Sequence, residues 1–212
     1  MINLEYEVRF YFPKKQLANI INQLDQIREL KKDNRLYEKT MQYDHPSEEM
    51  SFYNKEIDGR FRIRISKDNH RSKCKITWKR RLATSFKTDI NQEEEFELTI
   101  LPEEYDSLIF IIEEVLKMKS IESYERYRTI YANKEIEVSL DEYPFGIALE
   151  IESKNNSNPE KIIKKWVKIL NLKLEEAYPL SCDDKYLELC NAQGVEVYKH
   201  ITFDLPMPEV IE

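Results

Sequence analysis

The chain has 212 residues, with 33 Lys and Arg against 40 Asp and Glu, so its formal net charge is −7. Its hydrophobic content of 41% can build a core, which excludes an intrinsically disordered chain. Only three glycines are present, Gly59, Gly146 and Gly194, and none lies near another. A glycine-rich phosphate loop or dinucleotide fingerprint is therefore excluded, and any phosphate must be bound by side chains.

Local composition excludes further classes. No apolar run approaches the roughly 18 residues of a membrane-spanning helix, and the first residues lack the apolar region of a signal peptide. Cys74, Cys182 and Cys190 are too few and too scattered for a disulfide framework or a cysteine-rich zinc site. We therefore expect a cytoplasmic protein that does not bind a membrane. The acidic balance also disfavours nucleic acid as a partner.

In chain order, the predicted elements are mostly short strands with a few amphipathic helices between them. Strands are predicted at residues 2–12, 37–44, 52–56, 60–66, 72–82, 93–100, 123–132, 135–141, 146–153 and 197–203. Helices are predicted at residues 14–30, 102–119, 160–170 and 183–190. Short gaps predict hairpins around Asp58-Gly59 and Asn133-Lys134. Because such gaps are too short for parallel crossovers, we predict an α+β fold with a dominant antiparallel sheet, which can close into a barrel.

Charged residues alternate with apolar residues along most of these strands, and several strands carry charges of one sign only. Side chains two positions apart lie on the same face of a strand. The basic positions of this kind are Arg60, Arg62, Arg64, Lys73, Lys75, Lys79, Arg126 and Arg128. The acidic positions are Glu93, Glu95, Glu97, Glu137, Asp141, Glu150 and Glu152. The first strand combines both signs, with Glu5, Glu7 and Arg9 on one face.

A sheet with one solvated face is the simplest interpretation of such alternation. The complete set favours a barrel, because the amphipathic helices can cover the apolar face and leave the charges inside. Buried charges of both signs need pairing or a ligand. Arginine and lysine bind phosphate oxygens, and glutamate binds a hard divalent cation that bridges the same oxygens. The two charge classes therefore predict a site for a metal-bound triphosphate.

In order and spacing, these motifs resemble those of the CYTH proteins, also called triphosphate tunnel metalloenzymes, over roughly residues 2–190. The opening E-x-E-x-K motif of that family corresponds to Glu5-Tyr6-Glu7-Val8-Arg9, where arginine replaces the usual lysine. The remaining matches are Arg62-Ile63-Arg64, Lys75-Ile76-Thr77-Trp78-Lys79, Glu95-Phe96-Glu97, Arg126-Tyr127-Arg128, Ser139-Leu140-Asp141, Glu150-Ile151-Glu152 and Lys185-Tyr186-Leu187-Glu188-Leu189.

The resemblance implies an eight-stranded antiparallel β-barrel, the triphosphate tunnel, in residues 1–190, with helices packed outside and Mg²⁺ or Mn²⁺ within. The implied metal ligands are Glu5, Glu7, Glu150 and Glu152. The implied phosphate-binding residues are Arg9, Arg62, Arg64, Lys75, Lys79, Arg126, Arg128 and Lys185. The implied catalytic carboxylates, which would serve a second ion or a water, are Glu95, Glu97 and Asp141.

Three functions stay open at this point. Metal-dependent hydrolysis of a triphosphate ranks first, with inorganic tripolyphosphate or an organic triphosphate, such as a nucleotide or thiamine triphosphate, as substrate. A class IV-type adenylyl cyclase ranks second, because the same clamp would hold ATP while the ribose 3′-oxygen attacks the α-phosphate. A non-catalytic polyphosphate-binding or nucleotide-binding module ranks third. All four implied metal carboxylates are present, which favours an enzyme.

Residues 191–212 have no counterpart in the resemblance and form a C-terminal extension. Within it, residues 197–203 predict either an added edge strand or a contact in an oligomer such as a homodimer. Trp166, on a helix, and Cys74, which alternates with the lysines of its strand, are predicted to be buried structural residues.

Overall fold

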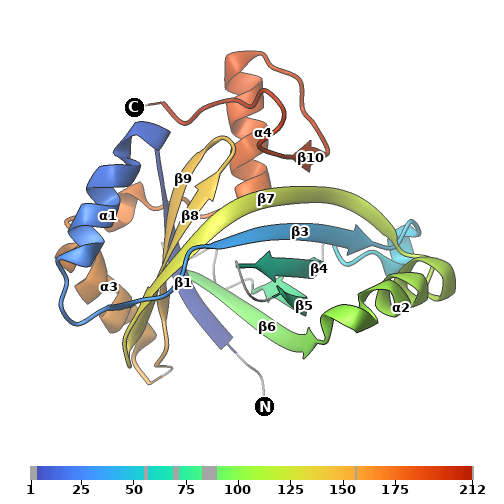
Figure 1. The fold of residues 1–212 in the computed structure, drawn as a ribbon, viewed down its shortest axis with the longest axis horizontal. Helices are drawn as coiled ribbons and strands as arrows, with labels where there is room; N and C mark the ends of the chain where they lie inside the picture. The colour runs from blue at the N-terminus through green and yellow to red at the C-terminus, as the bar shows by residue number, and fades with distance from the viewer. Residues whose placement is uncertain (1–3, 55–56, 69–71, 83–89, 156, 212) are drawn as a thin grey trace.

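The computed structural model describes residues 4–54, 57–68, 72–82, 90–155 and 157–211. Eight antiparallel strands close into a barrel (Figure 1). Around the ring they are β7 (Lys119–Ala132), β3 (Leu36–Asp44), β4 (Asp58–Lys67), β5 (Ser72–Arg81), β6 (Asn91–Ile100), β1 (Leu4–Phe12), β9 (Gly146–Ser153) and β8 (Ile136–Tyr143). β8 then pairs again with β7 and completes the ring. The predicted α+β fold and its barrel are thereby confirmed.

Four α-helices lie outside the ring: α1 (Leu17–Asp25), α2 (Tyr105–Phe110), α3 (Pro159–Ile169) and α4 (Cys182–Gln193). Short 3₁₀ segments are η1 (Lys14–Gln16), η2 (Glu48–Met50), η4 (Pro102–Glu104) and η6 (Leu174–Glu176), and η5 (Ile111–Val115) is a π-helical continuation of α2. Two-residue strands β2 (Lys31–Lys32) and β10 (His200–Ile201) flank β7 outside the ring. No helix in the described ranges has the length and apolar character needed to cross a membrane.

The hydrophobic core lies between the outer surface of the barrel and the helices. α1 and α3 pack over β1, β8 and β9, where Trp166 is fully buried. α2 and its continuation η5 cover the outer faces of β3, β4 and β5, and Ile112 of η5 joins a cluster containing Ile63 and Cys74. α4 packs over β7 and β9 through Tyr186 and Cys190. The apolar side chains that contact α1, α2, η5 and α3 point outward, so the charged side chains that alternate with them point inward. The contacts of α4 differ, because Tyr124 and Ala148 lie on the inward face with Arg126 and Glu150.

The predicted hairpin at residues 52–56 and 60–66 is wrong. β4 begins at Asp58 and pairs with β3 and β5, and in the described part of residues 52–56 only Tyr53 forms a bridge, to Asp58. The Asp44 carboxylate accepts hydrogen bonds from the Phe52 amide at 2.8 Å and the Ser51 hydroxyl at 2.7 Å. These bonds curl the segment after β3 into a loop. Residues 55–56 lie outside the described part of the chain.

Two helices and one strand are shorter than predicted. The first α-helix ends at Asp25, because the chain continues into β2 beside β7. The helix after Pro102 ends before Lys117, whose φ of 57° is left-handed and reverses the chain into β7. In the tail, only His200 and Ile201 of the predicted strand pair, in parallel with β7.

Removal of the buried side chain beneath α2 tests the packing of this outer layer. Ile63 is 0% exposed and Ile211 is 73% exposed. We expect Ile63→Ala to lower the free energy of unfolding by about 2–5 kcal/mol, because it leaves a cavity in a close-packed cluster. The matched substitution Ile211→Ala is expected to change it by less than about 0.5 kcal/mol. Chemical denaturation of both variants measures the difference, and equal losses would contradict the packing of α2 on the sheet.

Candidate active site

The interior of the barrel is a cavity of about 440 Å³ lined mainly by charged side chains. Thirteen of the sequence-predicted site residues line it: Glu5, Glu7, Arg9, Arg62, Arg64, Lys75, Lys79, Glu95, Glu97, Arg126, Arg128, Glu150 and Glu152. Every strand of the ring contributes at least one lining residue. The period-two alternation of the sequence is therefore what places these charges around one space.

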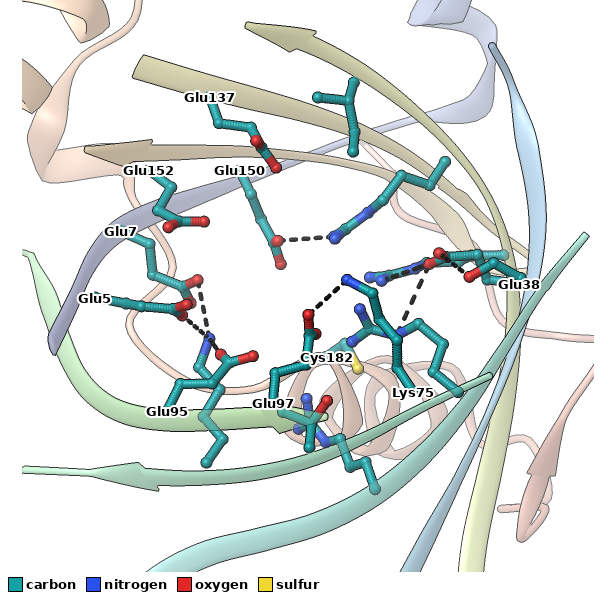
Figure 2. A pocket seen from close by; sticks show the side chains of 18 of the residues that line it. Glu5, Glu7, Glu38, Lys75, Glu95, Glu97, Glu137, Glu150, Glu152 and Cys182 are labelled. Atoms are coloured by element: carbon teal, nitrogen blue, oxygen red, sulfur yellow. Dashed lines mark hydrogen bonds and ion pairs between the residues drawn. The ribbon is translucent and has the colours of Figure 1, made fainter. Parts of the chain in front are cut away.

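Strand order separates the two signs of charge into walls. β6, β1 and β9 are neighbours in the ring, and they carry Glu5, Glu7, Glu95 and Glu152. The other wall consists of β5, β4, β3 and β7, which carry most of the lysines and arginines. Figure 2 shows Glu5, Glu7, Glu95 and Glu152 gathered at one side of the cavity. A ligand between the walls would contact carboxylates on one side and cations on the other.

Lys79 lies at the centre of the carboxylate wall. Its Nζ is 2.9 Å from Glu5, 2.9 Å from Glu93, 3.1 Å from Glu95 and 3.5 Å from Glu7. Lys79 and Glu95 are direct cross-strand neighbours in the β5–β6 register. One ammonium therefore stands among four carboxylates, and it offsets only part of their charge.

A second network of ion pairs runs along β9, β7 and β3. Arg9 contacts Glu150 at 2.6 Å, and Glu150 accepts a hydrogen bond from Arg128 at 2.9 Å. Farther along, Arg126 Nε donates to Glu38 at 2.8 Å. Because each guanidinium here already has a carboxylate partner, its planar donor set is held in a fixed orientation in the tunnel wall.

Arg62 and Arg64 lack the close carboxylate contacts that Arg9, Arg126 and Arg128 make. Among the described residues, the only side-chain hydrogen bond of Arg62 is a long one, 3.4 Å from Nε to Gln42. The Arg64 Nε is buried without a hydrogen-bond partner, and its nearest carboxylate oxygen, on Glu38, is 3.9 Å away. A buried donor without a partner costs free energy, so both groups are suited to an anionic ligand.

Two of the sequence-predicted site residues do not line the cavity. Asp141 is fully buried behind the wall, where Arg128 Nε donates to one oxygen at 2.6 Å and Arg126 to the other at 2.9 Å. Asp141 can thus act on a ligand only through these arginines. Lys185 lies on α4 away from the cavity lining, with its Nζ 2.9 Å from Glu188 and above the Tyr178 ring.

The sequence interpretation missed two buried acids in the tunnel as site residues. Glu38 accepts hydrogen bonds from Ser66 and Arg126, and Glu93 contacts Lys79. Glu93 shared the face of Glu95, a signal that was available in the sequence. Glu38 lies on a strand whose other inward residues are uncharged, so alternation alone could not identify it.

Burial and neighbouring charges separate the pKa values of the tunnel carboxyl groups. Burial raises the pKa of Glu5 to about 9, although Lys79 opposes the shift. Burial raises that of Glu152 to about 7. For Glu95, burial is outweighed by Lys79, and the pKa falls to about 2. Carboxyl groups close to one another thus differ in ionisation at neutral pH, an arrangement typical of functional sites.

The acidic wall fits a hard divalent cation by its chemistry. Its donors are carboxylate oxygens, which Mg²⁺ and Mn²⁺ prefer, and no thiol lies among them. Within the described ranges, no three acidic, thiol or imidazole groups converge in a metal-binding arrangement. Instead the Lys79 ammonium occupies the centre of the carboxylates, as a cation in the place where a metal would bring positive charge.

Comparisons with known proteins identify the fold. No family model and no curated protein matches the chain. Among solved structures, the PH1819 protein from Pyrococcus horikoshii OT3 is similar, with a TM-score of 0.64 and 24% identity over 89% of this chain and 99% of that one. A candidate adenylate cyclase from Vibrio parahaemolyticus has a TM-score of 0.63 and 14% identity, over 87% and 98% of the two chains.

HpAC1 from Hippeastrum, which shows a dominant triphosphatase activity, is similar over 91% of this chain and 97% of its own, with a TM-score of 0.57 and 14% identity. The structural neighbours thus include CYTH-type proteins, as the sequence motifs predicted. At these identities the likeness shows a shared fold. The function of this chain must be argued from its own site.

The raised pKa of Glu5 predicts how stability depends on pH in the metal-free protein. The folded state keeps a proton on Glu5 that the unfolded chain releases near the ordinary pKa of 4.5. Stability from this group is therefore present below 4.5 and is lost as the pH rises through about 9. Glu5→Gln resembles the protonated form, so its melting temperature should match the wild type near pH 5 and exceed it near pH 9.

Thermal unfolding in the presence of a chelator measures this effect. The exposed substitution Glu160→Gln serves as the control and should leave the difference between the two pH values unchanged. A Glu5→Gln protein less stable than the wild type near pH 9 would show that Glu5 is ionised and paired with Lys79 instead.

Proposed function

We propose that the chain hydrolyses a triphosphate, bound in the barrel, in a reaction that requires Mg²⁺ or Mn²⁺. The observation that carries this proposal is the pair of under-satisfied guanidinium groups, Arg62 and Arg64, in the barrel cavity opposite a wall of carboxylates. Free donors on one side suit phosphate oxygens, and carboxylates on the other suit the cations that accompany a polyphosphate.

The residues of the basic wall bind and orient the phosphates in this proposal. Arg62 and Arg64 donate to phosphate oxygens, while Lys75 and Arg126 add positive charge along the chain of phosphates. Lys75 is now 2.6 Å from Glu97, so it exchanges this partner for the ligand when the ligand binds. Preorganised cations stabilise charge that develops on the transferred phosphoryl oxygens, and this effect supplies most of the catalysis in phosphoryl transfer.

The acidic wall holds the metal in this proposal. Glu5, Glu7, Glu150 and Glu152 are the carboxylates assigned to it, and Glu95 and Glu97 orient the attacking water and accept its proton. A bound divalent cation would polarise the phosphoryl oxygens and lower the pKa of a coordinated water. Because ionisation of Glu5 and Glu152 is disfavoured by burial, metal binding has to displace protons from this wall.

The structural neighbours support the same proposal. HpAC1 shows a dominant triphosphatase activity on this fold, and the Vibrio protein carries an adenylate cyclase description. Hydrolysis and cyclisation both require cations that bind and orient a triphosphate, so the tunnel alone does not distinguish the two reactions. Their products do distinguish them.

A product assay with tripolyphosphate and ATP, each with Mg²⁺ or Mn²⁺, tests the activity. We expect orthophosphate release that stops when a chelator removes the metal, because the carboxylate wall alone repels a polyanion. Cyclic AMP with pyrophosphate from ATP would identify a cyclase instead. A protein that binds either compound but converts neither would be a binding module.

Removal of one phosphate-binding arginine tests the basic wall. We expect Arg62→Ala to raise the KM for the triphosphate substrate about tenfold or more, because a charge-assisted bond of roughly 1.5–3 kcal/mol is lost. Arg80→Ala is the matched control, since Arg80 alternates with the inward residues of β5 and pairs with Glu94 instead. Steady-state kinetics of both variants measures the shift, and an unchanged KM in Arg62→Ala would place the phosphates elsewhere.

A further inference from the structure

Two threonine hydroxyls in the barrel, those of Thr40 and Thr77, are buried without a hydrogen-bond partner among the described residues. Thr40 is 0% exposed and Thr77 is 1% exposed. A buried hydroxyl without a partner costs free energy, and native proteins contain few of them. The two threonines differ in one respect, because Thr77 lines the tunnel and Thr40 does not. A ligand in the tunnel can therefore supply a partner to Thr77 alone.

Thr77 lies at the boundary between the basic wall and the acidic wall. On β5 it shares the inward face with Lys75 and Lys79. Across the sheet it is the direct neighbour of Arg62 on β4 and of Glu97 on β6. Side chains opposite each other in an antiparallel pair have Cβ atoms about 4.5–5.5 Å apart. The hydroxyl thus lies at the base of the Arg62 side chain, whose guanidinium also lacks a close partner.

The Thr77 hydroxyl oxygen is closed to solvent in this structure, although the residue lines the cavity. Lys75, two residues away on the same face, is 2.6 Å from Glu97, the residue opposite Thr77 (Figure 2). This ion pair therefore crosses from β5 to β6 beside Thr77. The pair is half-exposed, so its lysine is free to exchange the carboxylate for another anion.

We propose that Thr77 is a phosphate-binding residue, whose hydroxyl donates a hydrogen bond to the same phosphate group that Arg62 binds. Binding draws Lys75 from Glu97 to the ligand and opens the space above the hydroxyl. The hydroxyl then gains a charged acceptor, which offsets the cost of its burial in the complex alone. The inference rests on the proposed function, because it requires a triphosphate in the tunnel.

Thr77→Val, which removes the hydroxyl and keeps the shape of the side chain, tests this role. Calorimetry with a bis(methylene) analogue of tripolyphosphate, whose P–C–P links resist hydrolysis, measures binding in Mg²⁺ without turnover. We expect Thr77→Val to bind the analogue about tenfold more weakly. Without ligand, its midpoint of thermal unfolding should rise by about 2 °C, because a buried unpaired hydroxyl is gone. A residue that only supports the sheet would lose stability and affinity together.

Thr40→Val is the matched control. Thr40 is opposite Arg64 in the β3–β4 register and has the same unpaired hydroxyl, but it lies outside the cavity lining. This variant should gain similar stability, while its Kd for the analogue changes less than about twofold. Equal losses of affinity in the two valine variants would show that both hydroxyls act through packing beneath the arginines, which would overturn the inference.

A double substitution tests whether Thr77 and Arg62 bind one phosphate. Groups that share a ligand group are coupled, so Thr77→Val should weaken binding less than about threefold when Arg62→Ala is already present. Losses that multiply fully would place the hydroxyl on a different group and contradict the inference.

Failure of the inference is distinguishable from failure of the proposed function. A Thr77→Val protein that binds the analogue as tightly as the wild type would overturn the role of Thr77 and leave the proposed function standing. A wild type that does not bind the analogue would overturn both. Hydrolysis is measured separately, so its absence does not affect the binding comparison.

Discussion

Closing eight strands into a barrel removes every second side chain of each strand from bulk water, and in this protein most of those side chains are charged. The tunnel lining contains eleven lysines and arginines and ten aspartates and glutamates, so basic and acidic groups are nearly equal in number. Without that balance the barrel could not close, since isolated buried charges cost several kcal/mol each. Cross-strand register provides the balance: Arg9 faces Glu150, Lys79 faces Glu95 and Arg126 faces Glu38.

The same balance limits what the tunnel can bind. A triphosphate adds several negative charges to a cavity in which most cations already have carboxylate partners. The basic wall can accept the phosphates only if its arginines exchange carboxylate partners for phosphate oxygens, and the released carboxylates then need cations of their own. Divalent cations are the strongest local charges available for this purpose. In the proposed function a divalent cation supplies this charge, because Lys79 alone offsets only part of the charge of the acidic wall.

The inward face of the strands was readable from the sequence, because period-two alternation fixes which residues share a face. How deeply each side chain is buried, and how the helices pack against the barrel, could not be predicted from the sequence. Asp141 shares the face of the tunnel residues but lies behind Arg126 and Arg128, since two arginines cover it. Lys185 depends on how α4 packs against the barrel, which no local pattern encodes. Gly59 suggested a turn, yet a Cβ there would lie 2.3 Å from Trp78, so the glycine permits close packing.

The barrel and the C-terminal extension are held in place by different kinds of contact. Charges in the barrel are locked by the register of eight strands, so a change at Arg126 or Glu38 would leave a buried partner uncompensated. The described part of the C-terminal extension does not depend on such a pairing of charges. Val197 and Tyr198 lie on a surface segment attached mainly through backbone amides and one hydroxyl, and side-chain changes there leave those bonds intact. Side chains of this segment can therefore be substituted without disturbing the charged register of the barrel.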